Sequence, residues 1–147
     1  MLPEFDEDGD LPAGIHAATL AEIEGRFGRF TVSDRRVRLF VRLRQIAELA
    51  WSSGIVERVL VAGSFITAKP EPNDVDLVLL ISSEIELDDL TPSQYAMTNR
   101  RALRRIVKQS DYDATIVRAG AEDEREAMEF FQETRSGKKV GIVEVKQ

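Results

Sequence analysis

The sequence predicts a small α/β (α+β) domain in which helices flank a mixed β-sheet of about four strands. Short apolar runs bounded by turn residues alternate with longer amphipathic segments, a pattern typical of strands and helices in one chain. A length of 147 residues suits one hydrophobic core. No internal repeat and no glycine- or proline-rich linker divides the chain.

The first ten residues differ in composition from the rest of the chain. They carry five acidic side chains together with Pro3 and Gly9, and they contain few apolar residues. Such a segment buries too little apolar surface to offset the entropy lost on ordering, so we expect residues 1–10 to be a disordered acidic arm. Residues 11–147 then form a single domain that begins with a loop over residues 11–15.

Four segments carry helix signals. Thr19 and Glu22 have the spacing of a capping box, and Thr91-Pro92 places a cap before a proline in the first helical turn. After Ser33 or Asp34, apolar residues recur near a period of 3.6, and acidic residues after Ala121 suit the start of a helix. The predicted helices cover about residues 20–27, 34–52, 92–109 and 122–134.

Four apolar runs are predicted as strands, over about residues 56–62, 75–82, 112–118 and 140–145. The loop between the first two is too short for a crossover helix, so these strands should be antiparallel. The third follows a helix and can run beside the second. The second run is apolar nearly throughout, which favours a central position with both faces buried.

The composition excludes several kinds of site. The chain has no cysteine, and therefore no disulfide, thiolate metal site or cysteine nucleophile. Its longest wholly apolar run, Leu77 to Ile81, is far shorter than the ~20 residues of a membrane span. A net charge of −6 argues against broad nonspecific binding to nucleic acid. We expect a cytoplasmic protein with no membrane partner.

The segment from Val59 to Ile81 carries the clearest chemical signal. Asp74 and Asp76 lie at the start of the second strand, on one face and roughly 6.5 Å apart at Cα. Two carboxylates this close repel unless a cation lies between them, and Mg²⁺ is usually held by one or two carboxylates plus substrate phosphates. The preceding Gly63-Ser64 turn offers backbone N–H groups, a close approach and a hydroxyl to such a substrate.

The Asp-x-Asp pattern alone has little weight, because it also occurs at Asp6/Asp8, Asp8/Asp10 and Asp111/Asp113. The context is more informative: strand, Gly-Ser, a spacer of nine residues, and Asp-x-Asp at the head of a second strand. A surface hairpin with solvated aspartates is the simpler alternative. Aspartate is disfavoured in strands, which weakens that alternative.

This segment resembles the signature of the nucleotidyltransferase superfamily typified by DNA polymerase beta. In that family a third acidic residue comes from a later neighbouring strand, and Tyr112-Asp113-Ala114-Thr115-Ile116-Val117 is similar to that strand. Asp113 is the expected residue, and Asp111 is the fallback candidate. The resemblance covers about residues 33–118, and the chain looks most like small stand-alone bacterial members. It implies the small mixed sheet of the nucleotidyltransferase fold.

The resemblance also implies an activity and its site. Asp74, Asp76 and Asp113 would be the catalytic residues and would bind two Mg²⁺ ions, while Gly63 and Ser64 would bind the phosphates of a nucleoside triphosphate. ATP is the expected nucleotide, and AMP would be transferred to a hydroxyl of a protein or RNA acceptor. Small members of the group often serve in toxin–antitoxin or phage-defence modules.

Several alternatives stay open. The chain could instead be a catalytically weak antitoxin or regulatory subunit that binds a partner through its acidic arm, and either role is compatible with a homo- or hetero-oligomer. A small-molecule acceptor is less favoured, because no segment is left over to build a pocket for it. Lys69 could reach the triphosphate or be a solvated loop lysine. The basic residues from Arg100 to Lys108 form either a solvated helix face or an electropositive wall.

Overall fold

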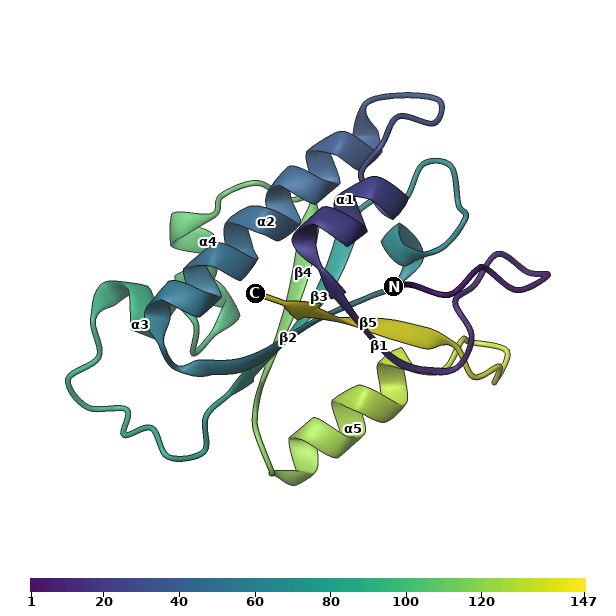
Figure 1. Cartoon of the computed structure of the whole chain (residues 1–147). Helices are drawn as coiled ribbons and strands as arrows, with labels where there is room; N and C mark the ends of the chain where they lie inside the picture. Colours follow the sequence, from purple (N-terminus) through teal and green to yellow (C-terminus); the bar gives the residue numbers. More distant parts are fainter.

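One mixed sheet of five strands organises the molecule, in the order β1-β5-β2-β3-β4 (Figure 1). The computed structural model describes all residues from 1 to 147. Strand β2 pairs antiparallel with β3 and β5, whereas β1 with β5 and β3 with β4 are parallel pairs. The strands are β1 (Gly14–Thr19), β2 (Val56–Ala62), β3 (Val75–Ile81), β4 (Tyr112–Arg118) and β5 (Gly141–Lys146).

Helices cover both faces of the sheet (Figure 1). Helix α2 packs on one face over the larger apolar core, and α5 packs on the other face over a smaller one. No helix of the chain is both long enough and apolar enough to span a bilayer. The helices are α1 (Leu20–Phe27), α2 (Arg35–Ser53), α3 (Pro92–Ala96), α4 (Arg100–Ile106) and α5 (Glu122–Phe131), and a 3₁₀ turn η1 (Ser64–Ile66) follows β2.

Strand β3 is buried on both faces, as its nearly continuous apolar run predicts. Val75, Leu77 and Leu79 belong to the core under α2, while Val78 and Leu80 belong to the core under α5. The expected arrangement of the neighbouring strands is confirmed, because β3 runs antiparallel to β2 and lies beside β4. The β3–β4 pair is parallel.

The sheet has one strand more than the sequence predicts. Residues 14–19 pair in parallel with β5, from Gly14 opposite Gly141 to Thr19 opposite Lys146. The expectation that 11–15 is only a loop was therefore wrong in its second half. Most of β1 is exposed, so it lacks the alternation of buried residues that marks a strand in sequence, and its hydrogen bonds come from a segment more than 120 residues away.

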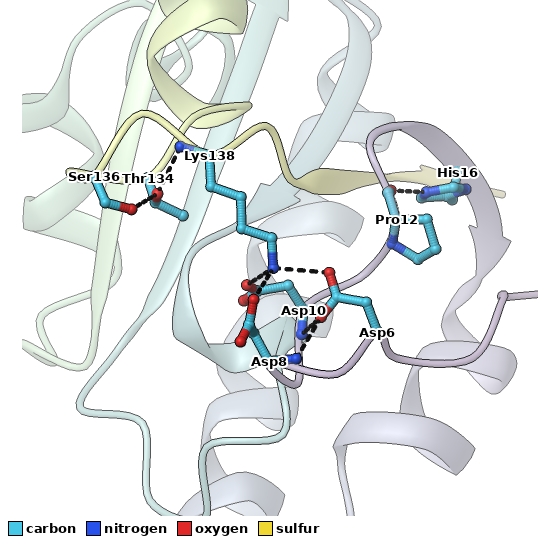
Figure 2. Close-up of polar contacts among 8 residues, drawn as sticks. All are labelled: Asp6, Asp8, Asp10, Pro12, His16, Thr134, Ser136 and Lys138. Carbon is cyan, nitrogen blue, oxygen red and sulfur yellow. Dashed lines mark hydrogen bonds and ion pairs between the residues drawn. The ribbon is translucent and has the colours of Figure 1, made fainter.

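The segment 1–10 differs from the expected disordered arm. Leu2 is buried in the main core, and Phe5 stacks at a tilt on Phe27, with ring centroids 6.0 Å apart. Lys138 also binds three acidic side chains of this segment, at 2.8 to 3.0 Å (Figure 2). The prediction failed because it rested on the acidic composition, whereas the segment is held by two apolar side chains and by a lysine that is distant in sequence. The three side chains are Asp6, Asp8 and Asp10.

The single helix predicted over 92–109 is two short helices. Helix α3 ends at Ala96, and the side chain of Asn99 then caps α4 by accepting a hydrogen bond from the Ala102 N–H at 2.7 Å. Asparagine competes with the helical backbone for such bonds, which explains why one helix ends before Asn99 and a new helix begins after it. The helical part of the arginine stripe therefore runs only from Arg100 to Arg105, with Lys108 beyond its end.

Candidate active site

Asp76 and Asp113 lie side by side at the start of two parallel strands. They are directly paired in the β3–β4 register, on strands that lie about 4.8 Å apart. Their sequence neighbours Val75, Leu77 and Tyr112 turn to the core under α2, so the two aspartates face the α5 side. Asp74 precedes β3 by one residue and shares this edge of the sheet.

The three carboxylates repel one another. Partial burial, followed by the charges of Asp74 and Asp113, raises the pKa of Asp76 to about 6. Partial burial also raises the pKa of Asp74, with a further contribution from Asp113, while the positive charge of Lys69 acts in the opposite direction. Removing carboxylates from water and placing them near like charges costs free energy that a bound cation would recover.

Arginines contact the third carboxylate and its fallback. Arg100 on α4 donates to Asp113 Oδ1 at 2.6 Å, and both side chains are about half exposed. Arg42 on α2 donates to Asp111 Oδ1 at 2.8 Å. Asp111 is thus paired with the helix layer on the opposite face of the sheet, whereas Asp113 lies on the face of Asp76. The structure places Asp113, rather than Asp111, with the other two aspartates.

The Gly63-Ser64 turn also reaches this edge. Ala62 pairs with Asp76 in the β2–β3 register, and Gly63 follows directly. Gly63 has φ 77° and ψ −162°, a backbone conformation that only glycine adopts readily. A Cβ built at Gly63 would overlap Asp76 Oδ2, so the backbone approaches the carboxylate as closely as sterics allow. Ser64 then begins η1 beside this contact.

A buried arginine fixes the loop after the turn. Arg36 on α2 is only 5% exposed, and its guanidinium donates to three carbonyl oxygens of this loop. The acceptors are the carbonyls of Phe65 at 2.6 Å, Thr67 at 2.7 Å and Lys69 at 2.5 Å. A fourth bond, to the Phe27 carbonyl, ties the same guanidinium to α1. These bonds hold residues 65–69 of the spacer to α2, while the Lys69 side chain stays exposed.

A cavity of about 890 Å³ opens beside the turn. Gly63, Ser64 and Asp76 line one side of it, and α5 with the chain that follows lines the other. The α5 side presents two aromatic rings, Phe130 and Phe131, which pack edge to face at 4.9 Å between centroids. The lining carries five acidic side chains and one arginine: Asp10, Asp76, Glu126, Glu129, Glu133 and Arg135.

Two groups of carboxylates thus compete as candidates for a metal. Asp6, Asp8 and Asp10 form the one group of three whose ligand atoms all lie within 4.8 Å of one another. The ammonium of Lys138 already occupies the centre of that group (Figure 2). The set of Asp74, Asp76 and Asp113 is wider, and it includes two carboxylates whose pKa values are raised. Both sets offer hard oxygen donors, and this second set is the better candidate for Mg²⁺ because Lys138 already neutralises the first.

A family model described as "Family of unknown function (DUF6932)" matches residues 3–146, nearly the whole sequence. The chain belongs to the DUF6932 family. Among solved structures, this DUF6932 chain is similar to a "putative nucleotidyltransferase" from Sulfolobus solfataricus, with 16% sequence identity and a TM-score of 0.39 over 73% of this chain and 80% of that one. A likeness this weak does not bear on activity. Among curated proteins, none matches the sequence.

Sequence reasoning missed two residues at this site of the DUF6932 chain. No local pattern distinguishes Arg36 from the other arginines of the same helix, yet it is the one buried arginine of α2. Its position beside Phe40 and Leu39 in the helical repeat does not reveal four carbonyl partners, because three come from the distant loop at residues 65–69 and one from the end of α1. The pairing of Arg100 with Asp113 was also missed, since it depends on how α4 lies against β4.

Replacing Gly63 by alanine is expected to cost more stability than the same change at Gly54, which is a matched control. Gly54 also has a positive φ, 75°, but no atom lies within 4 Å of an added Cβ there. We expect Gly54→Ala to lose about 1 kcal/mol from backbone strain alone. Gly63→Ala should lose about 2 kcal/mol or more, because strain and the overlap with Asp76 add. Urea denaturation measures both losses, and equal values would contradict the close contact.

The raised pKa of Asp76 predicts that the metal-free DUF6932 protein loses stability as pH rises. Asp76 titrates at about 6 when folded and near 3.8 when unfolded, so between these values the folded chain binds more protons. Its stability contribution is therefore present at low pH and declines through pH 6. Asp76→Asn should be more stable than wild type at pH 7.5 by roughly 1 kcal/mol, because solvent screening reduces the ~3 kcal/mol of a full shift. Denaturation at pH 4 and pH 7.5 tests this, and a difference that does not change with pH would contradict it.

Proposed function

We propose that the protein is a metal-dependent nucleotidyltransferase that transfers a nucleoside monophosphate, expected to be AMP from ATP, to a hydroxyl of an acceptor. One observation carries the proposal: the strand registers set Asp76 opposite both Asp113 and Ala62, the residue before Gly63. This register puts two carboxylates from adjacent strands beside a glycine turn that lines a cavity of about 890 Å³. Phosphoryl transfer needs mainly positioning and neutralisation of charge. The turn would position the phosphates, and the divalent cations that the carboxylates would hold would neutralise their charge.

In the proposed reaction the acceptor hydroxyl oxygen forms a bond to the α-phosphorus of the nucleotide. The bond from that phosphorus to the oxygen bridging the β-phosphate breaks, and pyrophosphate leaves. The hydroxyl proton passes to a carboxylate, for which Asp113 is the candidate. Asp74, Asp76 and Asp113 would hold Mg²⁺, which when bound supplies positive charge to the phosphates. Gly63 and Ser64 would orient the phosphates through the backbone N–H groups and the hydroxyl.

The cavity beside Gly63 suits a nucleotide that arrives with cations. Its volume of about 890 Å³ is in the range of small-molecule sites. Five acidic lining residues would repel bare phosphates, so binding of the triphosphate should require divalent cations. Phe130 is 72% exposed and offers an aromatic face on which a base could stack.

Transfer of label tests this function. Protein incubated with ATP labelled at the α-phosphate, Mg²⁺ and cellular RNA or protein should attach the label to one of these acceptors. The same reaction with EDTA, or with Asp74→Ala, should show none. Label attached equally by Asp74→Ala would contradict the assignment of the site. Absence of transfer with every acceptor, together with no Mg²⁺-dependent nucleotide binding in equilibrium dialysis, would overturn the proposed function.

The second candidate, a binding subunit with little catalysis, depended on an acidic arm that is available to a partner. In the folded chain the aspartates of that segment are bound to Lys138. The segment is therefore part of the domain surface. A basic partner would have to displace Lys138, a lysine of the same chain, from these aspartates. We favour the enzyme for this reason.

A further inference from the structure

We propose that the acceptor is a single strand of RNA, bound by arginines of α4 and α2 on the Asp113 side of the site. This inference rests on the proposed function and names its acceptor. The relevant surface, here called the arginine flank, surrounds the start of β4. Its members are Arg35 and Arg38 from α2 and Arg100, Arg101, Arg104 and Arg105 from α4.

Contacts show that the two helices converge on one short segment. Arg100 binds Asp113, and the Arg104 guanidinium lies 5.6 Å from the centre of the Tyr112 ring. Arg35 and Arg38 line a small hollow of about 320 Å³ together with Asp111. Arg100 therefore contacts the carboxylate proposed to receive the acceptor's proton, and Arg35, Arg38 and Arg104 lie near the same start of β4, on the side of α2.

Helix α4 contributes four of its seven residues to the arginine flank. Leu103 is the only buried residue of the helix, and its four arginines fall within roughly 140° of arc at 3.6 residues per turn. Arg101 and Arg105 make no ion pair with any carboxylate of the chain. A short helix that exposes unpaired guanidinium groups beside a reactive site is suited to bind phosphates, which arginine contacts in bidentate fashion.

The two sides of the site have opposite charge, which separates the two substrates. Five of the six charged residues that line the cavity beside Gly63 and Ser64 are acidic, and Asp113 does not line it. The acceptor hydroxyl must reach Asp113, and the protein surface next to Asp113 is the arginine flank. An acceptor that enters on this side should carry repeated negative charge together with a free hydroxyl. RNA combines phosphates with 2′ and 3′ hydroxyls. Binding would be local, so the net charge of −6 does not oppose it.

The test measures binding of a fluorescent 12-nucleotide single-stranded RNA to the full chain by anisotropy, between 50 and 300 mM NaCl. The variant is Arg101→Ala with Arg105→Ala, two exposed positions where alanine favours the helix. The control also removes two exposed arginines, Arg44→Ala with Arg118→Ala. Arg44 lies about 200° around α2 from Arg42, and Arg118 ends β4 at the far end from Asp113.

We expect loss of two phosphate contacts in the Arg101/Arg105 variant. The slope of log affinity against log salt should become shallower by about 1.4, and affinity at 0.1 M salt should fall about 20-fold. The control should stay within about twofold of wild type. Equal weakening in the control, or wild-type affinity in the Arg101/Arg105 variant, would overturn the proposal. Stronger competition by polyglutamate than by unlabelled RNA would also overturn it, because the flank would then fit an acidic protein.

Failure of this inference can be distinguished from failure of the proposed function. RNA binding needs no chemistry, so Asp76→Asn should bind the oligonucleotide as well as wild type does. Label transfer to a protein, without RNA binding, would overturn the RNA acceptor alone. Binding of RNA without any label transfer or Mg²⁺-dependent nucleotide binding would overturn the proposed function, and only RNA binding by the arginine flank would stand.

Discussion

Asp76→Asn is expected to lower nucleotidyl transfer by about 1,000-fold or more while the protein stays folded. Asp76 is the carboxylate that lies beside both Gly63 and Asp113, so its loss removes a ligand at the centre of the proposed site. Metal ligands contribute several kcal/mol of transition-state stabilisation, and each 1.4 kcal/mol is a factor of ten in rate. Initial rates with α-labelled ATP and a saturating acceptor measure the loss.

The opposite effects on activity and stability make this variant informative. Asparagine keeps the shape of the side chain and removes the repelled charge, so the melting temperature at pH 7.5 should not fall. Asp88→Asn, at an exposed loop position, makes the same chemical change away from the site and should leave the rate within about twofold. An Asp76→Asn variant with more than a tenth of wild-type activity would exclude Asp76 as a metal ligand.

Among the arginines of α2, Arg36 is expected to be the one whose replacement by alanine lowers the free energy of unfolding most, by about 3–4 kcal/mol. The guanidinium satisfies four backbone carbonyls, and its removal leaves several of them buried without a donor. The aliphatic stem is lost as well, which opens a cavity beside Phe65. Chemical denaturation gives the change in the free energy of unfolding.

The matched control for Arg36→Ala is Arg38→Ala on the same helix. Arg38 is 62% exposed and its one ion pair is with Asp34, at 3.4 Å, so its loss should cost under about 0.5 kcal/mol. Hydrogen exchange should also be faster at residues 65–69 in the Arg36 variant, because these carbonyls hold the loop to α2. Similar losses in the two variants, or unchanged exchange in the loop, would contradict the role given to Arg36.

Local patterns in the sequence determined most of the fold. The apolar runs at 56–62 and 75–82 specified β2 and β3, because a strand buried on both faces needs nearly continuous apolar residues. The capping pair Thr19 and Glu22 specified the start of α1, and both of its hydrogen bonds form. The short loop between β2 and β3 fixed their antiparallel pairing. These signals act over a few residues, so they can be read without the tertiary structure.

Part of the candidate site could also be predicted from local sequence, and part depended on the tertiary structure. Asp74, Asp76, Gly63 and Ser64 were predicted because they lie within one strand–turn–strand segment of the sequence. The choice of Asp113 over Asp111 was expected, but it became a geometric statement only with the β3–β4 register and the pairing of Asp111 with Arg42. Which residues carry the reaction stays a prediction until the variants are measured.

Contacts between distant segments decided the rest. Strand β1, the ordered N-terminus on Lys138, the burial of Arg36 and the pairing of Arg100 with Asp113 all join residues that no local pattern relates. A charged side chain looks alike in sequence whether it is solvated or buried among partners, because its free energy depends on what surrounds it. The sequence by itself determined four of the five strands and the catalytic candidates, and only the packing of distant segments against one another decided which charges meet.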